Sequence, residues 1–311
     1  MFSSWPGRSR IRCSVSSNEA RLEGKMLGRV TVGLFFLLLV WGNLLAGMKA
    51  GLACPDWPLC HGKVLPPFRV DIYMEFLHRV IAAAAGVFLV LLGLQRYRDY
   101  RGAARAVPVL AVAFLAVEIL LGGAVVLFRI PVQLTTVHFM LGLAVFLLAV
   151  YMASFDGVIE PPVFSLSGRS ALFFGVGSLV FLLAALGAYV RHSEAGLACA
   201  GWPLCPDGLI PKNLTGLVLI HFSHRVLAAL VALTSVALYA AVALDRRLQE
   251  SKGLARWLII LAAGQVAVGG LVVLSKLYFL ATGLHMAIAL GMLVVLFHLW
   301  AREVKRGEVL S

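Results

Sequence analysis

The chain has 311 residues, of which 61% are apolar and only 14% are charged, and its mean hydropathy is +0.93. This composition excludes an ordinary water-soluble enzyme, whose charged fraction is nearer a quarter, and it excludes a disordered chain, which needs low hydrophobicity. The net charge of +12 is typical of the topology signal and anionic-lipid contacts of a membrane protein, and no basic–aromatic interleaving indicates a nucleic-acid partner.

Eight apolar runs have about the 20 helical residues that are needed to cross a bilayer core. They cover about residues 28–49, 73–95, 107–128, 134–155, 171–191, 217–243, 256–275 and 281–301. Runs of this length must be helices, because a lone strand leaves its backbone groups unsatisfied in lipid. We therefore predict an all-α integral membrane protein with eight transmembrane helices, the first of them retained rather than cleaved as a signal peptide.

Basic residues predict the orientation of these spans. If the N-terminus lies inside, the inner segments hold 18 of the 27 Lys and Arg residues. This bias predicts that both termini are cytoplasmic and that the segments near residues 50–72 and 192–216 are extracytoplasmic.

The chain contains an internal duplication. Residues Gly51–Cys60 recur as Gly196–Cys205, with eight of ten positions identical at an offset of 145. Later landmarks keep the same order at offsets of 146 and 147 and pair His78-Arg79-Val80 with His224-Arg225-Val226, Glu118 with Gln265, Gly122-Gly123 with Gly269-Gly270, Arg129 with Lys276, and His138 with His285. Each repeat holds four spans, so both halves have the same orientation and are expected to be related by a pseudo-twofold axis along the membrane normal.

This duplication predicts the domain organisation. We expect an N-terminal extension over 1–26, a first four-helix bundle over 27–155, a linker over 156–170, a second four-helix bundle over 171–302 and a cytoplasmic tail over 303–311.

Four histidines occupy equivalent places in the even-numbered spans: His78, His138, His224 and His285. Even-numbered spans begin outside, so the four imidazoles are expected at one depth near the outer leaflet. A single histidine there is as often a snorkelling side chain, but four at repeat-equivalent positions favour a ligand role. Two histidines on different helices can hold haem iron from both faces. Zinc fits less well, because it favours four clustered ligands.

Charged residues flank the histidines. Glu75 lies one helical turn before His78, where the second repeat has His221. A carboxylate beside a bound cofactor can move protons, although a carboxylate near a helix N-terminus is also favoured by the helix dipole. Arg79, Arg225, Arg129 and Lys276 are candidate partners of haem propionates, with snorkelling to headgroups as the alternative. Glu118 lies in mid-span and must be protonated or paired.

Four cysteines form two pairs, Cys54–Cys60 and Cys199–Cys205, in the predicted extracytoplasmic loops. That compartment favours disulfides. A structural bridge is the expectation for Cys199–Cys205, whereas a redox-active pair stays open for Cys54–Cys60. The remaining histidines, His61, His192 and His298, are expected to have structural roles.

Taken together, these motifs resemble the haem A synthase family over about residues 27–301. The resemblance rests on the four-plus-four spans, the four histidines, Glu75 in a Glu-Phe-Leu-His-Arg run and the paired loop cysteines. It implies a bacterial plasma-membrane oxidoreductase that converts a methyl group of haem O into the formyl group of haem A by successive hydroxylations. It also implies haem b between His224 and His285, with Arg225 and Lys276, and the substrate haem between His78 and His138, with Arg79 and Arg129, while Glu75 assists the chemistry.

Two other functions use the same histidines. A dihaem membrane cytochrome for electron transfer needs neither Glu75 nor the cysteines, and a haem transporter holds its cargo only transiently. For the enzyme, haem O synthase, an electron acceptor or thiol-redox partner, and a second copy of the chain are candidate partners.

Overall fold

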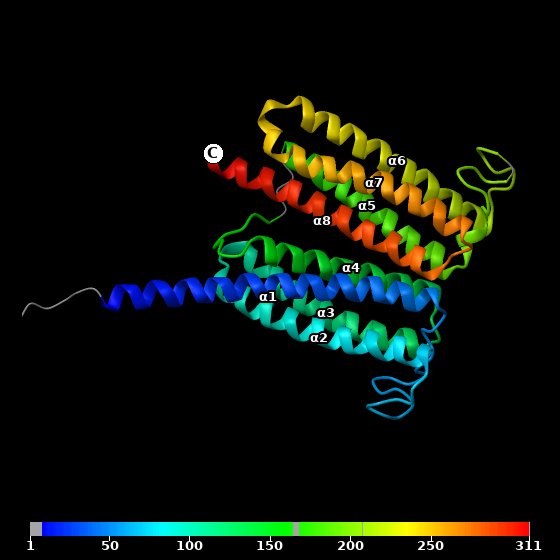
Figure 1. The fold of residues 1–311 in the computed structure, drawn as a ribbon, viewed down its shortest axis with the longest axis horizontal. Coiled ribbons are helices and arrows are strands. Elements are labelled where there is room, and N and C mark those ends of the chain that lie inside the picture. Colours follow the sequence, from blue (N-terminus) through cyan, green and yellow to red (C-terminus); the bar gives the residue numbers. More distant parts are fainter. Residues whose placement is uncertain (1–7, 164–167, 207, 311) are drawn as a thin grey trace, which may run out of the picture.

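The computed structural model describes residues 8–163, 168–206 and 208–310 (Figure 1). Its α-helices are α1 Arg8–Gly47, α2 Val70–Asp99, α3 Ala106–Leu127, α4 Val132–Ser154, α5 Arg169–His192, α6 Gly216–Leu244, α7 Lys252–Leu274 and α8 Phe279–Leu310, with short 3-10 helices η1 Gly102–Arg105, η2 Ala195–Leu197 and η3 Arg246–Ser251. Eight segments of this described chain are long and apolar enough to cross a membrane, which confirms the predicted spans.

The helices group by repeat. Figure 1 shows α1–α4, here called the first half, beside α5–α8, the second half, with all eight axes running in nearly the same direction. The first half meets the second mainly where α1 packs against α8 and where α4 packs against α5. One continuous apolar cluster includes residues of both halves, so the core does not stop at the boundary between them.

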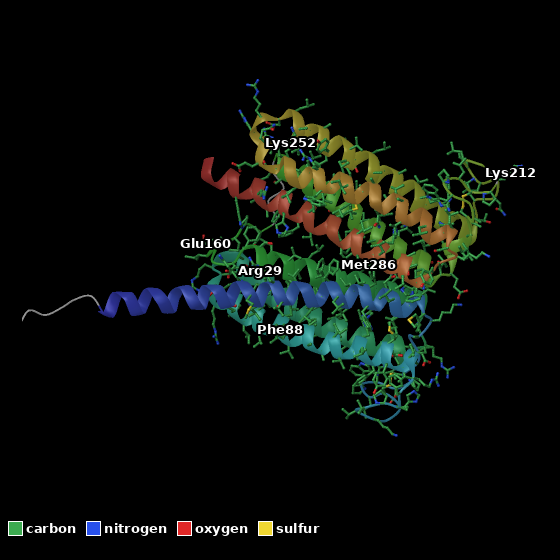
Figure 2. The ribbon with its side chains drawn as sticks, viewed as in Figure 1. Arg29, Phe88, Glu160, Lys212, Lys252 and Met286 are labelled. Carbon is green, nitrogen blue, oxygen red and sulfur yellow. A yellow bond between two sulfur atoms is a disulfide. The ribbon has the colours of Figure 1, made fainter. Side chains whose placement is uncertain are left out.

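The two ends of the helices differ in what they carry. The loop between α1 and α2 (residues 48–69) and the loop between α5 and α6 (residues 193–215) lie at one end; we call them the first and second disulfide loops. Figure 2 places Lys212 at this end, and Glu160 and Lys252 at the opposite end. This separation follows from the even number of spans in each repeat. The predicted linker over 156–170 lies at the Glu160 end, and its residues 164–167 fall outside the described part.

Several helices are longer than their apolar runs. Helix α2 continues past residue 95 because Arg96 is fully buried with its charge compensated. Its guanidinium pairs with Asp156 at 2.5 Å and with Asp99 at 3.1 Å, and its Nε donates to the Met152 carbonyl at 2.9 Å. Helices α1 and α8 likewise extend into the polar segments predicted as extension and tail. Hydropathy therefore located the spans but underestimated the helices.

Candidate functional site

The four predicted ligand histidines lie at closely similar depths. His78 and His224 lie about 12 Å along the helix axis from the first residues of α2 and α6, and His138 and His285 lie about 9 Å from those of α4 and α8, all at the end of the disulfide loops. Within each half the two histidines come from the two even-numbered helices, His78 on α2 with His138 on α4 and His224 on α6 with His285 on α8. Their places along these helices repeat in both halves, as the duplication predicted.

Each imidazole packs against a glycine on the preceding odd-numbered helix. A methyl group on Gly42 of α1 would lie 3.0 Å from Cε1 of His78, and one on Gly187 of α5 would lie 3.1 Å from Cε1 of His224. Gly122 of α3 and Gly269 of α7 make the same close approach to His138 and His285, at 3.2 and 3.1 Å. Real Cβ atoms rarely come this close, so the glycines define the position of the rings.

The rings retain unused coordination capacity. The Nδ1 atoms of all four histidines, His78, His138, His224 and His285, are buried without a hydrogen-bond partner in the described chain. Buried polar groups are nearly always satisfied, so an orphan that occurs in both halves indicates a missing ligand or partner. Neutral imidazoles on facing helices are donors that haem iron accepts. The residues present therefore fit an iron porphyrin in each half. No group of three or more His, Cys, Asp or Glu in the described residues could hold a metal ion.

The mid-span partners of two histidines differ between the halves. Oε1 of Glu118 on α3 lies 3.1 Å from Nδ1 of His138, although the angle falls short of a hydrogen bond. On α7, Nε2 of Gln265 lies 3.3 Å from Nε2 of His285. Glu118 therefore lies beside a predicted ligand, with its Oε2 buried and without a hydrogen-bond partner among the described residues.

Both predicted disulfides are present. Cys54 bonds to Cys60 and Cys199 bonds to Cys205, with Cα atoms 4.7 and 4.8 Å apart. Each bridge closes a loop whose tryptophan packs on the helix below. A methyl group on Gly123 of α3 would lie 2.9 Å from the Trp57 ring, and one on Gly270 of α7 would lie 2.6 Å from the Trp202 ring. The second glycine of each Gly-Gly pair thus receives the disulfide loop.

Glu75 fastens the first disulfide loop to α2. Its side chain is buried, its Oε2 accepts the backbone N–H of Cys54 at 2.7 Å, and its Oε1 accepts from Arg79 at 2.6 Å. In the second half, Nδ1 of the buried His221 lies 3.2 Å from the backbone N of Cys199 and accepts its N–H. Nε2 of His221, which carries the ring proton when Nδ1 accepts, lies 3.3 Å from Nε of Arg225. In both halves a side chain of the helix after the loop accepts the backbone N–H of the first loop cysteine, and we call this contact the loop latch. The sequence did not reveal it.

The two arginines after the histidines bind loop carbonyls. Arg79 donates to the carbonyls of Asp56, Leu59 and Cys54 at 2.6–3.1 Å. Arg225 donates to the carbonyls of Cys199 and Gly201 at 2.6 and 2.7 Å. Their guanidinium groups thus hold the disulfide loops, so fewer of their donors are available for propionates than the sequence analysis assumed.

Arg129 and Lys276, unlike Arg79 and Arg225, have exposed side chains. Both follow the outer end of an odd-numbered helix in the left-handed region, with φ of 60° and 56°. Both are exposed, and neither forms an ion pair with a described residue. A non-glycine residue in this conformation is uncommon, and its occurrence in both halves shows that the turn is a shared feature of the repeat.

Two of the histidines expected to be structural, His61 and His298, have local partners. Nε2 of His61 lies 2.8 Å from the Ala53 carbonyl, and Nδ1 of His298 lies 2.7 Å from the Val294 carbonyl one turn earlier. Sequence reasoning missed Gly42 and Gly187, although their offset of 145 matches that of the cysteine motif.

The chain matches one protein-family model and is similar to several haem A synthases. The COX15-CtaA family model, described as cytochrome oxidase assembly protein, matches residues 68–297. The chain is 34% identical to a haem A synthase of Symbiobacterium thermophilum over 278 residues, which cover 85% of this chain and 90% of that relative. It is 32% identical to a haem A synthase of an Exiguobacterium species, over 80% of this chain and 82% of the relative. A haem A synthase of Bacillus licheniformis is 28% identical over 89% of this chain and 96% of its own length.

Proposed function

This chain belongs to the COX15-CtaA family of cytochrome oxidase assembly proteins, and from that premise we propose how its two halves divide the work. The protein is an oxidoreductase that converts haem O into haem A, the cofactor of respiratory oxidases. The observation that supports the division is the difference at one equivalent position, where Glu75 of the first half is replaced by His221 in the second. One pair of histidines holds the substrate and the other holds a resident haem.

The first half takes haem O between His78 and His138. Its latch position holds a carboxylate, Glu75, whereas the second half has an imidazole, His221, at the same place. Oxidation of a methyl group to a formyl group releases protons, and a buried carboxylate one turn from His78 is placed to accept them. Glu75 therefore has two roles in this proposal, as an acceptor for Cys54 N–H and as a proton acceptor during successive hydroxylations.

The second half holds haem b between His224 and His285. A haem with two imidazole ligands has no open coordination position and supplies electron transfer. Gly187 and Gly269 keep the two rings in place, while His221 and Arg225 keep the second disulfide loop closed over this end. The protein contributes orientation and a dry pocket around the haem.

Propionate contacts are assigned mainly to Arg129 and Lys276. Both carry exposed charges at the outer helix ends and have no ion-pair partner among the described residues. Arg79 and Arg225 remain predicted propionate contacts only through donors that their loop carbonyls leave free.

We also propose that the protein resides in the bacterial plasma membrane with both termini in the cytoplasm. The two disulfides then lie on the oxidising side. The excess of basic residues at the opposite end agrees with this orientation.

The test is porphyrin extraction from cells that make haem O and express this chain. Mass spectrometry is expected to detect the formyl product, and the loss of either His78 or His138 is expected to abolish it. Tightly bound haem without any conversion would contradict the assignment and favour an electron-transfer cytochrome. Alanine at His224 or His285 is expected to remove the low-spin haem spectrum of the second half while the protein still folds.

A further inference from the structure

We propose that Glu118 is a positioning residue that makes His138 a stronger electron donor to iron than its counterpart His285, so that the two haem sites differ in redox potential. This inference rests on the proposed function, because it takes His138 and His285 as iron ligands. It goes further by assigning a specific electrostatic asymmetry to two residues that the duplication pairs, Glu118 and Gln265.

The geometry sets a carboxylate against one ligand and a neutral amide against the other. Oε1 of Glu118 is 3.1 Å from Nδ1 of His138, and the two side chains are 15% and 26% exposed. Gln265 has an amide nitrogen 3.3 Å from His285, and its Oε1 is buried without a partner among the described residues. If Nε2 ligates iron in both halves, the nitrogen remote from iron lies beside the Glu118 carboxylate in the first half. In the second half that nitrogen, Nδ1 of His285, has no partner among the described residues, and the Gln265 amide lies beside Nε2 instead.

The neighbouring helix is shaped for the carboxylate only in the first half. A methyl group on Gly142 of α4 would lie 2.7 Å from Oε1 of Glu118, which is too close for a real Cβ atom. At the repeat offset of 147, the second half has Ala289 instead. Gly142 therefore makes room for Glu118 beside His138, whereas the second half has a methyl group there and an amide on the facing helix. Two linked differences at one place argue against an incidental substitution.

The chemical consequence follows from the partners of a ligating imidazole. A carboxylate close to the nitrogen remote from the metal draws that N–H toward its negative charge, and the ligand becomes more basic. A more basic ligand stabilises the ferric state, so the reduction potential falls. The remote nitrogen of His285 has no described carboxylate or other hydrogen-bond partner, so that imidazole is polarised less. The site of His138 should therefore have the lower potential of the two.

Redox titration of the purified, haem-loaded full chain tests this directly. Glu118→Gln is nearly isosteric and installs the residue of the second half. It is expected to raise the potential of the first-half haem by about 59 mV, a tenfold change in the equilibrium constant of a one-electron couple. The potential of the second-half haem should stay unchanged. The same titration of a His285→Ala protein, which retains only the first-half haem, shows which of the two reduction potentials belongs to that haem.

The reciprocal variant, Gln265→Glu combined with Ala289→Gly, installs both first-half residues and should lower the potential of the second-half haem. In both variants a low-spin spectrum at wild-type haem content verifies that ligation is intact, so a folding defect cannot imitate the shift. Unchanged potentials in both variants with haem bound would overturn the role of Glu118 alone. If replacement of His138 left the haem content of the protein unchanged, the proposed function and this inference would both be overturned.

Discussion

Glu75 and His221 occupy equivalent positions in the two halves, and each accepts the backbone N–H of the first cysteine in its disulfide loop, at 2.7 and 3.2 Å. A loop latch therefore needs only a hydrogen-bond acceptor at this position, because a neutral imidazole suffices in the second half. The loop contact alone does not require the carboxylate of Glu75. The negative charge of Glu75 is therefore available for a chemical role that His221 does not share.

Replacing Glu75 by histidine should preserve the latch and abolish the chemistry. We expect Glu75→His to retain bound haem and the Cys54–Cys60 bridge but to lose conversion of haem O, as measured by mass spectrometry of extracted porphyrins. Glu75→Ala should also lose conversion, and it should destabilise the loop by about 1–3 kcal/mol because the buried Cys54 N–H loses its acceptor. Wild-type turnover in Glu75→His would contradict the proton-acceptor role.

The glycines beneath the histidine rings should be intolerant of side chains. Gly187→Leu is expected to displace His224 and to weaken haem binding in the second half about tenfold or more, similar to other losses of support around a metal ligand. Soret absorbance per protein measures this. Gly175→Leu is the matched control on the same helix, since no atom lies within 4 Å of a Cβ built there. Equal haem content in both variants would contradict the packing role of Gly187.

Loss of the buried arginine at the end of α2 should cost more stability than loss of an exposed one. Arg96→Met leaves Asp156 without its partner inside the protein, and we expect a loss of about 3–5 kcal/mol in the free energy of unfolding. Arg69 pairs with Asp71 but is 67% exposed, so Arg69→Ala should cost less than about 1 kcal/mol. Thermal denaturation in detergent compares the two. Further replacement of Asp156 by leucine should recover part of the loss, because no charge then remains buried alone.

Acid should loosen the first disulfide loop through Asp56. Its carboxylate accepts the backbone N–H groups of Gly62 and His61 at 2.7 and 2.6 Å, which lowers the pKa of Asp56 below its ordinary value of 3.8. Because the folded-state pKa is the lower one, the stabilisation is present above the unfolded-state pKa and is lost as the pH falls through the folded-state pKa. Hydrogen exchange at the two amides should therefore accelerate only in strong acid. Asp56→Asn should remove this acid dependence, and an identical acid response in that variant would refute it.

The sequence was sufficient for the features that repeat or that hydropathy records. The eight spans follow from the length of the apolar runs, and the paired cysteines were identified from the duplicated motif and its predicted compartment. The four histidines were paired because their offsets of 146 and 147 nearly match the cysteine offset of 145, and their role as ligands stays a prediction. These features depend on local composition or on register, and both can be read along the chain.

Contacts between distant polar groups could not be read in the same way. The sequence suggested propionates for Arg79, whereas its guanidinium binds the carbonyls of Asp56, Leu59 and Cys54. Such a contact depends on how the disulfide loop folds back over α2, and no periodicity records that path. Gly42 was missed for a different reason: one glycine in an apolar helix carries no signal until the ring that packs on it is known.

The adjacent glycines of α3 have a mechanical consequence. Gly122 packs against the ring of His138 and Gly123 packs against the ring of Trp57, so two neighbouring residues position both a predicted ligand and the first disulfide loop. A shift of α3 along its axis would therefore move both contact sites by the same distance. The disulfide loop and the predicted ligand therefore move together with α3, and the same contacts on α7 let each half keep its own loop aligned with its own histidine.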